Sequence, residues 1–211
     1  MKIFVFDTET TWFINKKEKD LDKQPQVIQF AGILWEISKD KETNKWIWKE
    51  EERVNILINP EKAIPFETSQ VHHIYDIDVK DKENFEKQYK KILKFINEPD
   101  AIVGHNIEYD EEMIKLELRR LEKEYEYRPK QVICTMNDST NFCKLPKRDE
   151  KAKWFKRPKL WELHKVLFNK YFVWAHDAIV DVEATVKCFV ELVNKWVIKL
   201  EKKEENVMSL F

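Results

Sequence analysis

The stretch IFVFDTETT, residues 3–11, decides the fold. Its first four residues form a short, continuous apolar run of strong β-formers, which predicts a strand buried on both faces. Asp7 and Glu9 follow directly, and because they are two positions apart in extended chain they point to the same side. The stretch therefore predicts a buried strand that delivers two carboxylates to one edge of a sheet.

The rest of the chain predicts an α/β fold with a mixed sheet flanked by helices. Short polar turns join the first three strands, which indicates an antiparallel meander, whereas helix and strand alternate afterwards. At 211 residues the chain suits one domain, which we place at 1–200, followed by a tail at 201–211. We expect strands at 27–37, 46–58, 101–103 and 132–134, and helices at 66–74, 81–97, 108–125, 159–169 and 177–200.

Glycine is scarce in this chain, which has only Gly32 and Gly104. An average usage of about 7% would give roughly fifteen. The glycine-rich loops that bind phosphate in nucleotide-binding proteins need several glycines within a few residues, so the sequence excludes them. Any phosphate bound by this protein is therefore held by other groups.

Charge and cysteine content limit the partners and the cellular compartment that we expect for this protein. Lys and Arg total 38 and Asp and Glu total 39, so the net charge is −1 and any nucleic-acid footprint must be local. The three cysteines are too few for a disulfide framework, and their odd number favours a reducing, intracellular and cytoplasmic location. No run approaches about 18 apolar residues, and the chain does not start like a signal peptide, so no membrane partner is expected.

Two further acids follow predicted elements in the same way. Asp110 lies at the start of the helix after the strand at 101–103, and Asp181 lies one turn into the last helix, with His176 just before that helix. Ligands of open α/β sheets gather at the carboxyl ends of the strands, so we expect these side chains to meet the two acids of the first strand. Four carboxylates repel each other unless cations neutralise them. We therefore expect two Mg²⁺ (or Mn²⁺) ions, which suit oxygen ligands and phosphoryl displacement.

Three motifs resemble those of the DnaQ-like, DEDDh-type 3′→5′ exonucleases. FDTETT at 6–11 looks like their first motif, HNIEYD at 105–110 like their second, and HDAIVD at 176–181 like their third. The motifs occur in the family's order and together span nearly the whole chain. The resemblance, which extends to proofreading exonucleases of the DNA polymerase III epsilon type, implies a ribonuclease-H-like fold with a mixed five-stranded sheet.

The resemblance also implies a mechanism. It assigns Asp7, Glu9, Asp110 and Asp181 as metal ligands, and His176 as the general base that takes a proton from the attacking water. The implied reaction is hydrolysis of phosphodiester bonds from the 3′ end of DNA, single-stranded or frayed. It would release nucleoside 5′-monophosphates and would serve proofreading or repair.

Three alternative functions compete with this reaction. Trimming of short RNA uses the same motifs, and no residue that we can identify reads the 2′-hydroxyl that separates RNA from DNA. A non-catalytic replication subunit with this fold ranks low, because all five catalytic positions are filled. A phosphatase that begins with Asp-x-Asp-x-Thr fits poorly, since Glu9 occupies the second acid position.

Several residues near the motifs are predicted to bind substrate. QVHHI at 70–74 resembles the segment that meets the 3′-terminal nucleotide, and His73 stands where a glycine is usual; Trp12 likewise replaces a glycine that often follows the first motif. Both changes predict a pocket with bulkier walls. We expect Trp12 or Phe13 to stack on a base, and the alternative for Trp12 is a cover on the sheet edge. The predicted substrate contacts are Thr8, Thr10, Trp12, His72, His73, Asn106, Lys153, Lys156 and Arg157.

The segment before the helix at 159–169 is basic. Residues 151–160 carry five Lys or Arg side chains and no acid, interleaved with Trp154 and Phe155. This pattern favours a track for the phosphate backbone of a nucleic acid, and the alternative is a solvated loop.

The final residues, NVMSLF at 206–211, resemble the short peptides with which replication proteins dock on sliding clamps. The glutamine usual in such peptides is absent. The partner would be a sliding clamp or a DNA polymerase, and Met208, Leu210 and Phe211 would contact it. The alternative is that Leu210 and Phe211 fold back onto the domain.

Overall fold

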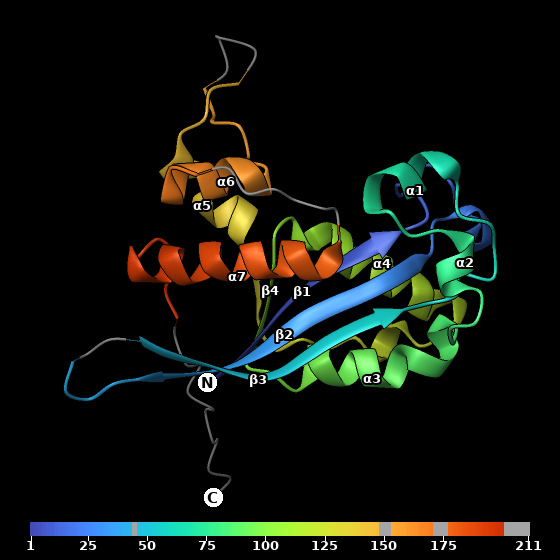
Figure 1. The fold of residues 1–211 in the computed structure, drawn as a ribbon, viewed down its shortest axis with the longest axis horizontal. Helices are drawn as coiled ribbons and strands as arrows, with labels where there is room; N and C mark the ends of the chain where they lie inside the picture. Colours follow the sequence, from blue (N-terminus) through green and yellow to red (C-terminus); the bar gives the residue numbers. More distant parts are fainter. Residues whose placement is uncertain (44–45, 148–152, 171–176, 201–211) are drawn as a thin grey trace, which may run out of the picture.

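The computed structural model describes residues 1–43, 46–147, 153–170 and 177–200. Its strands are β1 (Lys2–Thr10), β2 (Val27–Lys39), β3 (Trp46–Leu57), β4 (Ala101–Gly104) and β5 (Val132–Cys134). They form one sheet in the order β3-β2-β1-β4-β5 (Figure 1). β1 pairs antiparallel with β2, and β2 with β3, whereas β4 and β5 continue the sheet parallel to β1. The mixed five-stranded sheet predicted from the sequence is confirmed.

Helices cover both faces of this sheet (Figure 1). They are α1 (Phe66–His72), α2 (Asp76–Val79), α3 (Phe85–Asn97), α4 (Ile107–Arg120), α5 (Thr135–Cys143), α6 (Leu160–Phe168) and α7 (Ala178–Asn194), with short 3₁₀ turns at Leu21–Lys23 and Glu124–Glu126. α7 packs on one face together with α6, and α3 and α4 pack on the other. Among the described residues, no helix has the length and apolar character that crossing a membrane needs.

Alternate residues of β1 face two different cores. Phe4 and Phe6 are buried on the side of α3 and α4. Ile3 and Val5 are buried on the opposite side, in the core that α7 completes. Because side chains alternate along a strand, the two acids of the first motif point to the α7 side and Thr8 points to the α4 side.

Both glycines serve close packing rather than turns. A Cβ atom added to Gly32 in β2 would lie 2.2 Å from Cζ of Phe4 and 2.9 Å from the carbonyl oxygen of Val5. A Cβ atom added to Gly104 would lie 3.0 Å from Cβ of Ile107. Every left-handed position in the described part of the chain is filled by a residue other than glycine.

Several predicted helices are shorter in the structure. The helix expected at 66–74 ends at His72, because His73 takes a left-handed conformation (φ 57°) that stops α1. The helix expected at 177–200 ends at Asn194, shortly before left-handed Trp196 (φ 60°). Glycine usually marks such stops, so its absence concealed them in the sequence. The helices expected at 81–97, 108–125 and 159–169 are also trimmed at one or both ends.

α5 is an element that the sequence pattern did not reveal. Its residues, TMNDSTNFC, are mostly weak helix formers whose side chains compete for backbone hydrogen bonds. Ser139 donates to the carbonyl of Thr135 and Thr140 to that of Met136, so these hydroxyls are satisfied within the helix. Packing against α6 and α7 stabilises α5 in place of intrinsic propensity.

Candidate active site

Three carboxylates converge at the C-terminal end of β1. Asp7, Glu9 and Asp181 each bring one oxygen to within 4.8 Å of the others. Asp7 and Glu9 share the α7 side of β1, and Asp181 is the fourth residue of α7, so one turn of helix brings its side chain over the strand. The prediction that Asp7 and Glu9 point to one side of an extended strand is confirmed.

A buried amide of β2 fixes the start of α7. Gln29 donates from Nε2 to the carboxylate of Asp177 (3.0 Å), and its Oε1 accepts from the backbone N–H of Ala178 (3.3 Å). Asp177 is the N-cap of α7 and also accepts from the backbone N–H of Ile179 (3.2 Å). These bonds tie the first turn of α7 to the sheet, which positions Asp181.

Asp110 reaches the same strand end from the other face. It is the fourth residue of α4 and is 3% exposed. Its carboxylate accepts two hydrogen bonds from Thr8, one from the backbone N–H (3.0 Å) and one from the hydroxyl (2.7 Å). Thr8, which was predicted to contact substrate, therefore has its hydroxyl directed at a carboxylate and orients Asp110.

Burial and nearby negative charges raise the pKa of all four acids. Burial, followed by the charge of Asp110, raises the pKa of Asp7 well above its usual range. Burial and the charge of Asp181 raise the pKa of Glu9 to about 8. Burial raises the pKa of Asp110 to about 7 against the hydrogen bonds from Thr8, and burial raises the pKa of Asp181 to about 6. Without a counter-charge the cluster holds protons near neutral pH.

The donor set fits divalent cations. Atom Oδ1 of Asp181 is buried and has no hydrogen-bond partner among the described residues, which is costly for a carboxylate unless a cation satisfies it. Carboxylate oxygens are the ligands that Mg²⁺ and Mn²⁺ prefer. A cation at this point would also offset the burial and the negative charges that raise the four pKa values.

Mg²⁺ is expected to raise the melting temperature of the protein, and to raise it more at pH 8 than at pH 6. The folded pKa values of Glu9, Asp110 and Asp181 lie above the unfolded values of about 4, so the stability that these acids contribute is complete below about pH 4. That stability is lost as the pH rises through 6 to 8. A cation that binds only the folded state adds about 2.7 kcal/mol at roughly 100 times its Kd, or about 5–10 °C.

Differential scanning fluorimetry in EDTA and in Mg²⁺ at the two pH values measures both effects. NaCl at the same ionic strength is the control for screening of surface charges. Melting curves that coincide with and without Mg²⁺ would contradict a cation site at these carboxylates.

A hydrogen-bonded rim lies beside the acids. The hydroxyls of Thr10 and Tyr109 lie 2.9 Å apart, and both donate to the carbonyl of Trp12, at 2.9 and 3.0 Å. Trp12 is 47% exposed and meets Phe13, which is 73% exposed, edge to face. Two exposed rings therefore stand on a fixed backbone, as stacking on a nucleic-acid base requires.

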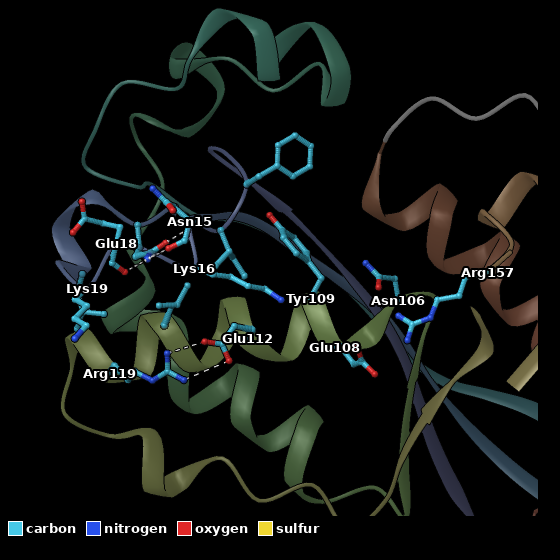
Figure 2. A pocket seen from close by; sticks show the side chains of 15 residues that line it. Asn15, Lys16, Glu18, Lys19, Asn106, Glu108, Tyr109, Glu112, Arg119 and Arg157 are labelled. Carbon is cyan, nitrogen blue, oxygen red and sulfur yellow. Dashed lines mark hydrogen bonds and ion pairs between the residues drawn. The ribbon is translucent and has the colours of Figure 1, made fainter. Parts of the chain in front are cut away.

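A groove of about 920 Å³ runs beside this rim, between α4 and the loop after β1 (Figure 2). Asn106 and Tyr109 line it from the start of α4, and Lys16 lines it from the loop. Asn106, a predicted substrate contact, has a left-handed conformation (φ 68°) as the N-cap of α4. Arg157, from the segment before α6, lies beside Asn106 at the end of the groove (Figure 2).

The other predicted substrate contacts have varied surroundings. His72 is buried, and its Nδ1 accepts from the backbone N–H of Ile74 (3.0 Å), so its ring holds the turn after α1. His73 is exposed at that turn. Lys156 pairs with Glu162 (2.6 Å), whereas Lys153 and Arg157 are exposed. Four predicted residues lie outside the described part of the chain and their roles stay predictions: His176, Met208, Leu210 and Phe211.

Sequence reasoning missed three residues that shape the site: Gln29, Tyr109 and His105. The ring of His105 lies between the hydroxyl of Thr135 (3.0 Å) and the carbonyl of Pro158 (3.0 Å), and burial lowers its pKa to about 4. His105 and Tyr109 stand inside the second motif, so the motif was the signal that could have found them. Nothing in the sequence distinguishes Gln29 from any other residue of a strand.

Solved structures share this fold. The nuclease domain of 3′hExo, a DEDDh family member, bound to rAMP, has a TM-score of 0.67 and 14% identity, with 96% of each chain covered. Exonuclease X with 5′ overhanging duplex DNA has a TM-score of 0.55 and 16% identity, with 95% of this chain and 96% of that chain covered. E. coli Exonuclease I with a dA16 oligonucleotide has a TM-score of 0.62 and 17% identity, with 92% of this chain and 41% of that chain covered. The expected ribonuclease-H-like fold is confirmed.

The sequence itself carries the family assignment. No curated protein matches the chain significantly. The family model of the RNase_T exonucleases matches residues 4–189, which include the positions of all four carboxylates. The chain therefore belongs to the RNase_T exonuclease family.

Proposed function

We propose that this protein is a metal-dependent 3′→5′ exonuclease that hydrolyses single-stranded or frayed DNA ends and releases nucleoside 5′-monophosphates. The observation that carries the proposal is the convergence of the oxygens of Asp7, Glu9 and Asp181 within 4.8 Å. Asp110 supports them from the opposite face through its bonds to Thr8. Family membership supplies the exonuclease activity.

Asp7, Glu9, Asp110 and Asp181 are the residues that would hold the cations. Two divalent cations bound there would stabilise the attacking and leaving oxygens of a phosphoryl displacement. The chain's own part is to fix the carboxylates: Thr8 orients Asp110, and the capped start of α7 positions Asp181.

His176 is our candidate for the general base. In the sequence it directly precedes Asp177, the N-cap of α7 that Gln29 ties to the sheet. An imidazole with an ordinary pKa near 6.5 can take a proton from water at neutral pH. A histidine in this role makes the rate rise with pH as the ring loses its proton.

The second candidate is the same reaction on short RNA. Among the structures with this fold, 3′hExo is bound to rAMP, whereas Exonuclease X and Exonuclease I are bound to DNA. DNA stays our leading substrate, with proofreading or repair as the setting. Docking of residues 206–211 on a sliding clamp or a polymerase stays a prediction, as does the division into a domain at 1–200 and a tail at 201–211.

The test compares DNA and RNA 10-mers of one sequence, labelled at the 5′ end. We expect a ladder of labelled products that shortens one nucleotide at a time from the 3′ end, faster on DNA, and that stops in EDTA. Immediate release of a labelled mononucleotide would indicate the opposite direction, and internal cuts would indicate an endonuclease. A faster ladder on RNA would select the second candidate.

A further inference from the structure

A second groove, of about 1,210 Å³, opens between α5 and the segment that leads into α6. Its walls carry Lys147, Lys156, Arg157 and Lys159, and no acid is found among the described residues that line it. This is a concentrated positive charge in a chain whose net charge is −1. The occupant that such a groove suits is a polyanion.

Exposed aromatic rings add a second kind of contact to this groove. Trp154 is 77% exposed and Phe155 is 42% exposed, and both line it. Asn137 and Asn141 of α5 add amide groups on the opposite wall. Cations that follow a backbone, together with rings on which bases stack, are the combination that binds single-stranded nucleic acid.

The wall of the groove is anchored before any ligand binds. The carbonyl of Pro158 is held by Nε2 of His105 at 3.0 Å, and the backbone N–H of Lys156 donates to the carbonyl of Leu145 at 2.9 Å. The Lys156 ammonium is paired with Glu162. Lys156 therefore stabilises the wall. Because this segment is already ordered, binding of a ligand costs little additional conformational entropy here.

Arg157 joins this groove to the groove along α4. It lines both the groove beside Trp154 and the groove along α4. In the second of these it lies beside Asn106, four residues before Asp110 (Figure 2). Its side chain is exposed. The two grooves therefore meet at Arg157, and the second passes Asn106 and Tyr109 at the start of α4, the helix that carries Asp110.

We infer that the groove beside Trp154 binds the part of a single-stranded nucleic acid that lies 5′ of the nucleotide being removed. A base stacks on Trp154, and Arg157 and Lys159 contact phosphates. The inference rests on the proposed function and deepens it: the preferred substrate is an extended single strand, whose nucleotides 5′ of the cleaved one occupy the groove beside Trp154.

Kinetics on two substrate lengths provide the first test. Trp154→Ala is expected to raise KM for a single-stranded 10-mer about 5- to 100-fold, the loss of one stacked base, and to leave kcat unchanged. Hydrolysis of a dinucleotide should not change. The matched control is Trp196→Ala, which removes a 71% exposed tryptophan that lines neither groove. Equal melting temperatures of the two variants exclude a folding defect.

Binding without cleavage provides the second test. Fluorescence anisotropy of labelled DNA and RNA 10-mers in EDTA should show weaker binding to Trp154→Ala than to Trp196→Ala. Arg157→Ala should reduce the slope of log K against log salt by about 0.7, the value for one phosphate contact on a single strand, whereas Trp154→Ala should leave the slope unchanged.

The two tests separate the inference from the function on which it rests. If the 10-mer is degraded but Trp154→Ala behaves like Trp196→Ala, the groove is not a binding site and the exonuclease stands. If neither substrate is degraded, the proposed function fails, and the anisotropy still decides the groove. Equal binding of the 10-mer by both variants overturns the inference in either case.

Discussion

Replacement of Asp7 by Asn is expected to abolish hydrolysis and at the same time to stabilise the protein in the absence of metal. The rate should fall at least about 1,000-fold, because charge stabilisation in a metal site supplies several kcal/mol of the lowered barrier. Asn is nearly isosteric and neutral, so it removes a buried carboxylate whose own pKa is raised by burial and by the charges of Asp110, Glu9 and Asp181. A gain of about 1 kcal/mol would appear as about 2–4 °C in the melting temperature in EDTA at pH 8.

Initial rates on a labelled 10-mer and thermal unfolding of the same samples measure the two effects together. Asp81→Asn is the control, since it removes an exposed acid outside the cluster. An Asp7→Asn protein with undiminished activity would exclude a catalytic role for the carboxylate cluster. Loss of activity with lower stability would show that Asp7 has a structural role instead.

Gly32→Ala is expected to cause the largest loss of stability of any conservative change at the sheet. The added Cβ would lie 2.2 Å from Cζ of Phe4 and 2.9 Å from the carbonyl oxygen of Val5. The Phe4 ring cannot move aside, because it is fully buried and stacks on Phe6 and Phe95. Overpacking at such a place costs about 3 kcal/mol.

Urea denaturation followed by circular dichroism measures this loss. Gly104→Ala is the matched control, because its added Cβ meets the side chain of Ile107 at 3.0 Å and the nearest backbone oxygen, that of Phe6, at 3.3 Å. We expect a clearly smaller destabilisation there. Equal unfolding free energies for Gly32→Ala and the parent chain would contradict the packing described around Phe4.

The sequence predicted the elements whose pattern is strong. The run at 3–6 marked the central strand, and the alternation after it placed Asp7 and Glu9 on one side. The motif order predicted that acids from two later helices would join them, and Asp181 does so in the structure. These features depend on local periodicity and on chain order, which a sequence displays directly.

The rest depended on contacts between distant residues. No sequence pattern indicates that the hydroxyl of Thr8 is directed at Asp110. Nor does any pattern indicate that Lys156 pairs with Glu162 and so stabilises the wall of the groove beside Trp154. Helix ends were hidden because left-handed positions such as His73 are not marked by glycine. α5 was hidden because its stability comes from its neighbours rather than from its residues.

The carboxylates come from the sheet and from helices on both of its faces, so the site is complete only when the whole chain has folded. Asp7 and Glu9 belong to the sheet, Asp110 arrives with the layer on one face, and Asp181 arrives with the layer on the other. A chain that has formed the sheet and one layer lacks at least one of the four carboxylates. On the proposed mechanism, hydrolysis therefore begins only after the last of these helices has docked.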